Sequence, residues 1–176
     1  MPKFFLPDNT VLINFAIIRR MDLLAEILKG QGSWCISIAR ECQKSESYYP
    51  DLAAANAIFG PPLTPDRIEY EDTRLLRDSM ASPGDPNTQH LGEAETIAII
   101  SRRRIGGFFL TDDRDAKHLA TQHGITVITT WDLLRHAHNT SKVTKPVLSG
   151  YLRTLKSHQR GNPPGVTNPD HLDDWL

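Results

Sequence analysis

Thr111, Asp112 and Asp113 place a hydroxyl and two carboxylates directly after a short apolar run at residues 107–110. The run is typical of a buried strand, and a helix is expected to begin just after it. In an open α/β sheet, ligands bind outside the carboxyl ends of the strands. Acidic side chains there suit a cation, and a cation suits phosphate chemistry. The alternative is that these residues only cap the next helix, but one cap needs only one such residue.

Four further acids stand near the ends of other predicted elements. Asp8 follows a first strand at residues 3–6, and Glu41 lies in the expected first turn of a helix at 39–44. Glu93 and Glu95 lie in the expected first turn of a helix at 91–100, in which Gly92 indicates tight packing onto the sheet. Each has a simpler explanation as a cap or as a complement to the helix dipole. Together they can gather at one sheet edge, where crowded carboxylates repel unless a cation such as Mg²⁺ or Mn²⁺ joins them.

The positions of these acids in the fold depend on the alternation of strands and helices along the chain. Strands are expected at residues 3–6, 33–38, 67–70, 107–110 and 125–129. Helices are expected near 10–18, 22–29, 39–44, 52–59, 72–80, 91–100, 115–124, 131–135 (capped by Thr130) and 147–158. The pattern predicts an α/β fold with a mostly parallel central sheet covered by helices on both faces. We expect one domain over residues 1–160 and an unstructured tail over 161–176.

Composition excludes several classes of protein. Of 176 residues, 39% are hydrophobic and 23% charged, and the net charge of −1 argues against a generally basic nucleic-acid binder, though not against a local basic patch. The apolar start at residues 1–8 is too brief for a signal peptide. The sequence also contains no apolar run long enough to predict a membrane span. The only cysteines, Cys35 and Cys42, suggest free thiols in a reducing cytoplasm.

Several motifs, in order, resemble the PIN-domain nucleases. Residues 8–13 (DNTVLI) resemble the opening Asp-Thr-Asn-Val-Leu motif of that family, with Asn9 and Thr10 in reversed order. Residues 91–98 (LGEAETIA) resemble a Gly-Glu-Ala-Glu helix start, and residues 109–116 (FLTDDRDA) resemble the Leu-Thr-Asp-Asp-Arg motif. Residues 124–130 resemble the strand that follows, so the likeness covers roughly residues 3–135. The order of motifs is more specific than any one of them.

The resemblance implies a PIN-like three-layer α/β/α sandwich and an endoribonuclease that uses Mg²⁺ or Mn²⁺. It implies metal ligands among Asp8, Glu93 and Asp113, catalytic acids that include Glu41 and Asp112, and supporting roles for Thr10, Glu95 and Thr111. The choices between Glu93 and Glu95, and between Asp112 and Asp113, remain open. Many such proteins are VapC-type toxins, so RNA, an antitoxin protein and a second copy of the chain are the implied partners.

The arginines allow two interpretations. Arg102, Arg103 and Arg104 end a predicted helix, where cations complement the dipole, and that explanation is favoured. The alternative is that these three and Arg114 contact RNA phosphates. Residues 45–89 carry no placed motif, and we expect them to influence the choice of substrate or partner. The main functional alternative is a non-catalytic PIN-like module that binds RNA or protein.

Overall fold

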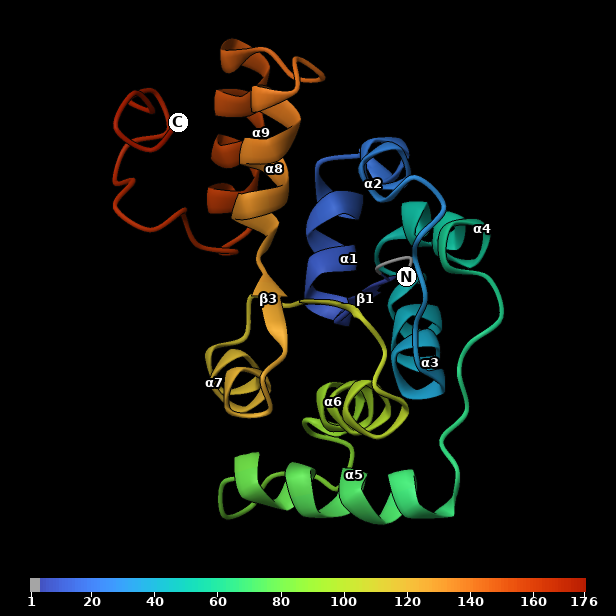
Figure 1. Ribbon diagram of the computed structural model, residues 1–176. Coiled ribbons are helices and arrows are strands. Elements are labelled where there is room, and N and C mark those ends of the chain that lie inside the picture. The colour runs from blue at the N-terminus through green and yellow to red at the C-terminus, as the bar shows by residue number, and fades with distance from the viewer. Residues whose placement is uncertain (1–3) are drawn as a thin grey trace.

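A short parallel sheet forms the centre of the molecule. The computed structural model describes residues 4–176 (Figure 1), so Lys3, the predicted start of the first strand, lies outside the described residues. The strands are β1 (Phe4–Pro7), β2 (Gly107–Leu110) and β3 (Thr126–Ile128), all parallel in the order β1-β2-β3. Parallel neighbours need long crossovers. The chain therefore brings residue 8 beside residue 111 although about a hundred residues separate them.

Helices cover both faces of this sheet. They are α1 (Asn9–Ile17), α2 (Met21–Leu28), α3 (Ile36–Ser45), the 3₁₀ helix η1 (Pro50–Ala54), α4 (Ala55–Phe59), α5 (Arg67–Met80), α6 (Leu91–Arg103), α7 (Arg114–Gln122), α8 (Thr130–Asn139) and α9 (Lys145–Ser157). One core packs Leu110 against residues such as Leu12 and Leu134, and the other packs Phe109 against Ile97 and Ala116. Because neighbouring residues of β2 enter different cores, the predicted α/β/α arrangement is confirmed.

The strand predicted at residues 33–38 is wrong. Only isolated bridges form there, Phe5 with Gly32 and Cys35 with Leu63, and α3 already begins at Ile36. The buried residues Cys35, Ile38 and Cys42 have the spacing of a helix face, which is the pattern that prevails. Glu41 consequently lies in the second turn of α3 and not in the first.

The edge strand predicted at residues 67–70 is also wrong, because α5 begins there. The Asp66 carboxylate accepts a hydrogen bond from the Glu69 amide (2.8 Å), and the Glu69 carboxylate accepts one from the Asp66 amide (2.8 Å). This reciprocal capping box fixes the helix start about one turn before the predicted position.

Residues 161–176 contain no helix or strand, yet they are packed against α8 and α9 and are not the unstructured end that we expected. Leu172 is fully buried, and the guanidinium of Arg135 lies 5.9 Å from the centre of the Trp175 ring. Asp170 accepts hydrogen bonds from Arg153 (2.7 Å) and Ser149 (3.0 Å). The division at residue 160 stays a prediction. Between residues 4 and 176, every helix is too short or too polar to span a membrane.

Candidate active site

Asp8 stands where β1 ends, beside the end of β2. Its amide donates to the Leu110 carbonyl at 2.7 Å, which joins the two strand ends. Its side chain is only 2% exposed, and one carboxylate oxygen accepts hydrogen bonds from the hydroxyls of Thr10 and Thr111, the latter at 3.3 Å. Asp8 is the N-cap residue of α1 by position, but its side chain makes no capping hydrogen bond. The capping explanation therefore does not account for this carboxylate.

Glu41 and Glu93 bring negative charge to the same place. Burial, followed by the negative charge of Glu93, raises the pKa of Asp8 to about 7. Burial, followed by the charges of Glu93 and Asp8, raises the pKa of Glu41 to about 8. Burial also raises the pKa of Glu93, with a further contribution from Asp113. Four of the six predicted acids thus form one electrostatically connected group, defined by Asp8, Glu41, Glu93 and Asp113 and called the acidic cluster below.

Asp112 and Asp113 have different surroundings. The Asp113 carboxylate caps α7 by accepting from the Ala116 amide at 2.7 Å, while its charge also acts on Glu93. Asp112 instead accepts hydrogen bonds from the Thr130 amide (2.8 Å) and the Thr130 hydroxyl. Burial raises the pKa of Asp112, and these hydrogen bonds oppose that rise. Asp112 is therefore held in a polar network beside the cluster.

Asn14 and Arg160 belong to that network and were missed from the sequence. The Asn14 amide nitrogen donates to Asp112 at 2.8 Å and to the Thr130 hydroxyl at 3.0 Å. Arg160 donates to Oδ1 of Asn14 at 2.6 Å and to the Thr10 carbonyl at 3.2 Å. A polar residue inside the buried run of α1 was the available signal for Asn14, whereas nothing in the sequence around Arg160 indicates its contact.

Thr130 was predicted to cap α8, but that prediction is wrong. The neighbouring Thr129 caps the helix by accepting from the Asp132 amide at 3.2 Å, in a reciprocal capping box. The Thr130 side chain is thereby free to bind Asp112.

The contacts of Glu93 and Glu95 also differ from each other. Glu95 is 4% exposed, and its two carboxylate oxygens accept from the Ser37 amide and hydroxyl, both at 2.9 Å. Its contacts tie α6 to the start of α3. Oε1 of Glu93 lies 3.7 Å from Nδ1 of His90, and it is Glu93 whose charge acts on Asp8 and Glu41. Glu95 lies one turn later in α6 than we expected.

Gly92 allows the close approach of α3 and α6. A Cβ atom at this position would lie 2.3 Å from Cδ1 of Ile38 and 2.9 Å from Oε1 of Glu41. Any larger residue would therefore displace the carboxylate of Glu41 or the core side chain of Ile38. The tight packing predicted at Gly92 was expected against the sheet, and the contacts of Gly92 are instead with α3.

The donor set of the acidic cluster consists of carboxylate oxygens, which Mg²⁺ and Mn²⁺ prefer. Three neighbouring carboxyl groups with raised pKa values are also a chemical environment in which a divalent cation would relieve repulsion. Within residues 4–176, however, no three Asp, Glu, His or Cys side chains converge as a metal-ligand group would. The acids fit a cation by type and charge, and binding would require their side chains to turn toward a common point.

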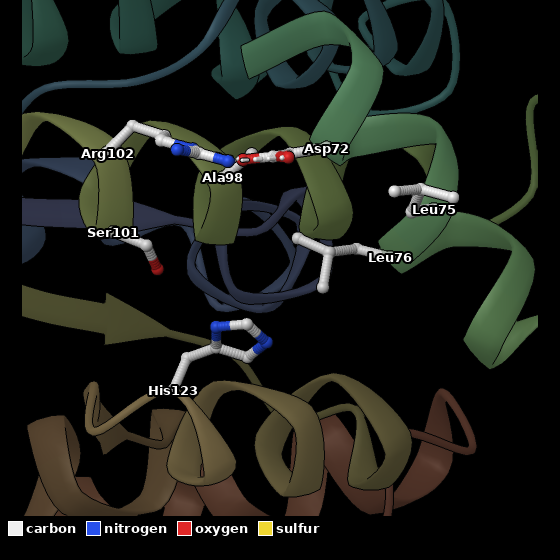
Figure 2. A pocket seen from close by; sticks show the side chains of 7 residues that line it. All are labelled: Asp72, Leu75, Leu76, Ala98, Ser101, Arg102 and His123. Carbon is white, nitrogen blue, oxygen red and sulfur yellow. Dashed lines mark hydrogen bonds and ion pairs between the residues drawn. The ribbon is translucent and has the colours of Figure 1, made fainter. Parts of the chain in front are cut away.

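The arginines predicted to contact RNA have unequal surroundings. Arg102 forms an ion pair with Asp72, at the edge of a cavity of about 420 Å³ between α5, α6 and the end of α7 (Figure 2). Arg103 pairs with the buried carboxylate of Glu69 at 2.7 Å. Both therefore hold α5 on α6. Arg104 and Arg114 are exposed.

The family model DUF3368, described as a PIN domain, matches residues 5–162. The chain therefore belongs to the PIN-domain family, as its motifs indicated, and PIN domains are generally nucleases. No curated protein and no solved structure gives a significant match to the chain.

Proposed function

We propose that this protein is a metal-dependent endoribonuclease that hydrolyses RNA phosphodiester bonds. The supporting observation is the acidic cluster beside the carboxyl end of β1, in which Glu93 raises the pKa of Asp8 and of Glu41, and Asp113 raises that of Glu93. A purely structural set of carboxylates would gain stability from cationic partners, and burial without them costs stability. Retaining such a group at a ligand-binding edge is typical of a functional site.

In this proposal, Asp8, Glu93 and Asp113 hold Mg²⁺ or Mn²⁺, and Glu41 adds negative charge beside them. The bound cation would make a water molecule acidic enough to attack a phosphodiester at neutral pH. Thr10 and Thr111 orient one oxygen of Asp8 through their hydroxyls, which leaves its other oxygen for the cation. Asp112 supports the site through Thr130 and Asn14.

The further parts of the proposal concern biology and partners. We propose that the protein is the toxin of a toxin–antitoxin pair, acts in the cytoplasm, and forms a homodimer. These proposals rest on the likeness of its motifs to VapC-type toxins. Among the predicted RNA contacts, we retain Arg104 and Arg114, because Arg102 and Arg103 already neutralise carboxylates of α5.

Cleavage of single-stranded RNA by the purified protein tests the activity. Wild type should cut with Mg²⁺ or Mn²⁺ and should not cut in EDTA. Asp8→Asn should be inactive, whereas Asp51→Asn, which changes an exposed aspartate of η1, should cut like wild type. Full activity of a folded Asp8→Asn, Asp113→Asn double variant would refute the proposed role of the acids.

A non-catalytic PIN-like binding module is the second candidate. It is favoured by one observation, namely that the acids of residues 4–176 do not converge as metal ligands. For such a module, the folded protein would neither cut RNA nor bind Mn²⁺, and Asp8→Asn would leave its binding of RNA or protein unchanged.

A further inference from the structure

One side of α5 forms part of a groove with α3 and the start of α6. A cavity of about 660 Å³ is lined by Ser37 and Arg40 of α3, by Leu91 and Glu95 of α6, and by Tyr70 of α5. A second cavity of about 300 Å³ lies on the other side of Tyr70 and Leu91 and is lined also by Arg74 and Arg77. The two cavities are neighbours, because both are lined by Tyr70 and Leu91, and they are together called the α5 groove below. Figure 1 shows α5 as an outer helix stacked on α6.

The α5 groove adjoins the acidic cluster along two elements. Arg40, which lines the groove, precedes Glu41 of the cluster in α3. Leu91, which both cavities share, stands two residues before Glu93 in α6. Residues two apart on a helix face different directions, so a chain molecule bound at the cluster would reach the groove by crossing the N-terminal end of α6.

Tyr70 offers an aromatic surface in the middle of this groove. Its side chain is 54% exposed, although α5 has a buried face on which a tyrosine could pack. Aromatic side chains that stand free in a positively charged groove are the usual stacking platforms for the bases of single-stranded nucleic acids. Stacking is tolerant of sequence, because every base has a π face.

The arginines of the groove differ in how far they are already paired. Arg67 pairs with Glu71 at 3.2 Å, and Arg77 pairs with Asp78 and binds the carbonyls of Pro86 and Gln89. The side chains of Arg40 and Arg74 form no ion pair or hydrogen bond with any residue of the described chain. They are the two groove cations whose charge is available to a ligand.

The carboxylates of the groove are largely occupied. Asp66 caps α5, Glu95 accepts two hydrogen bonds from Ser37, and Asp78 pairs with Arg77. The groove thus offers an exposed aromatic ring between unpaired guanidinium groups, whereas the neighbouring site offers acids.

We propose that the α5 groove binds the single-stranded RNA that leads into the acidic cluster, with a base stacked on Tyr70 and phosphates held by Arg40 and Arg74. This inference rests on the proposed ribonuclease function and assigns a substrate class and subsite to residues 66–78, where the sequence carries no family motif. The RNA must be single-stranded at this point, because the faces of a base inside a duplex are covered by the neighbouring stacked bases.

The test is binding of a fluorescent single-stranded RNA of about ten nucleotides, within the usual site size of single-strand binders, measured by anisotropy in EDTA. We expect Tyr70→Ala to raise Kd about 5-fold to 100-fold, and Tyr70→Phe to leave it within about twofold. Tyr48→Ala is the matched control, because Tyr48 is 81% exposed and lines neither cavity.

The salt dependence of binding separates stacking from phosphate contacts. Arg40→Ala and Arg74→Ala should each lower the slope of log Kd against log salt by about 0.7, and Tyr70→Ala should leave the slope unchanged. Arg19→Gln, at the opposite end of α1 from Asp8, should change neither Kd nor slope.

Parallel cleavage assays distinguish failure of this inference from failure of the proposed function. If wild type cuts the RNA but all groove variants bind it like wild type, the groove proposal is overturned and the nuclease proposal stands. If wild type binds RNA through Tyr70 and does not cut it with Mn²⁺, the groove proposal stands and the nuclease proposal fails. If wild type does not bind the RNA, or binds double-stranded RNA equally well, the groove proposal is overturned.

Discussion

Nε of Arg160 donates a hydrogen bond of 2.6 Å to Oδ1 of Asn14, and the amide nitrogen of the same Asn14 donates to Asp112 at 2.8 Å. Asn14 is 1% exposed, so Arg160 supplies a donor to a carbonyl oxygen that water does not reach. The guanidinium also lowers the pKa of Asp112 against the larger effect of burial. A residue that follows the last helix thus helps to orient the polar network of the candidate site.

Arg160→Met should therefore destabilise the protein and weaken cleavage. Leaving the buried Asn14 oxygen without a donor costs about 1–3 kcal/mol in the free energy of unfolding. Loss of a residue that orients site side chains typically lowers activity about 10-fold to 100-fold. Urea unfolding and RNA cleavage measure the two effects. Arg153→Met is the control, because its ion pair with Asp170 is exposed and should be worth under about 1 kcal/mol. Equal behaviour of the two variants would contradict the prediction.

The stability of the metal-free protein should fall as pH rises from about 4 to about 8. Folding raises the pKa of Asp8 from 3.8 to about 7 and of Glu41 from 4.5 to about 8. The folded state therefore binds more protons than the unfolded state in this interval, so each rise in pH favours unfolding. The slope should be on the order of 1 kcal/mol per pH unit.

Thermal unfolding across this pH range tests whether stability falls as pH rises. Asp8→Asn should flatten the curve, because the amide has no proton to lose. Mn²⁺ should raise Tm more at pH 8 than at pH 5, since the cation competes with protons for the same oxygens. A metal-free protein whose Tm increases steadily between these pH values would argue against the buried acidic cluster.

Glu93→Gln and Glu95→Gln should have opposite consequences. Glu93→Gln removes charge from the acidic cluster, so cleavage and Mn²⁺ binding should fall while stability at pH 8 is kept or increased. Glu95→Gln turns one acceptor of Ser37 hydrogen bonds into a donor, which should cost about 1–3 kcal/mol while Mn²⁺ binding survives. Mn²⁺ titration and urea unfolding of both variants test these expectations. Lost Mn²⁺ binding in Glu95→Gln together with lost stability in Glu93→Gln would contradict the roles that we assign.

Gly92→Ala should lower stability and cleavage, whereas Gly150→Ala should lower neither. The new methyl group at position 92 would overlap Ile38 and crowd Glu41, so α3 and α6 must separate at a cost of about 1–3 kcal/mol, with loss of cleavage. Gly150 lies within α9 with open space around it, so alanine there should stabilise the helix by up to about 1 kcal/mol. Circular dichroism during thermal unfolding compares them directly. A Gly92→Ala protein as stable and active as wild type would show that the close approach is unnecessary.

Much of the fold was predictable because its signals are local. The apolar run at residues 107–110 became β2, and a helix with acids near its start became α6. The segment 33–38 was misread because its β-branched and aromatic content resembles a strand, whereas the buried spacing of Cys35, Ile38 and Cys42 is helical. The start of α5 differs from the prediction because the capping box of Asp66 and Glu69 prevails over the strand-like alternation of residues 67–70.

The grouping of the acids was predictable in outline, and the choice among neighbouring acids was not. The carboxyl ends of parallel strands lie along one edge, and the direct pairing of β1 with β2 brings together the ends that carry Asp8 and Asp113. The separation of Glu93 from Glu95 depends on Ser37, and that of Asp112 from Asp113 depends on Thr130 and Asn14. These partners are distant in sequence, and no local pattern identifies them.

The same separations in sequence determine when the site can form during folding. Asn14 reaches Asp112 across 98 residues, Thr130 across 116 and Arg160 across 146. Local contacts form quickly, whereas contacts between remote segments wait until the intervening chain has closed. The helices can therefore gain structure while the candidate site is still unassembled, and a folding intermediate without the contact from Arg160 would have a nearly complete scaffold and an unfinished active centre.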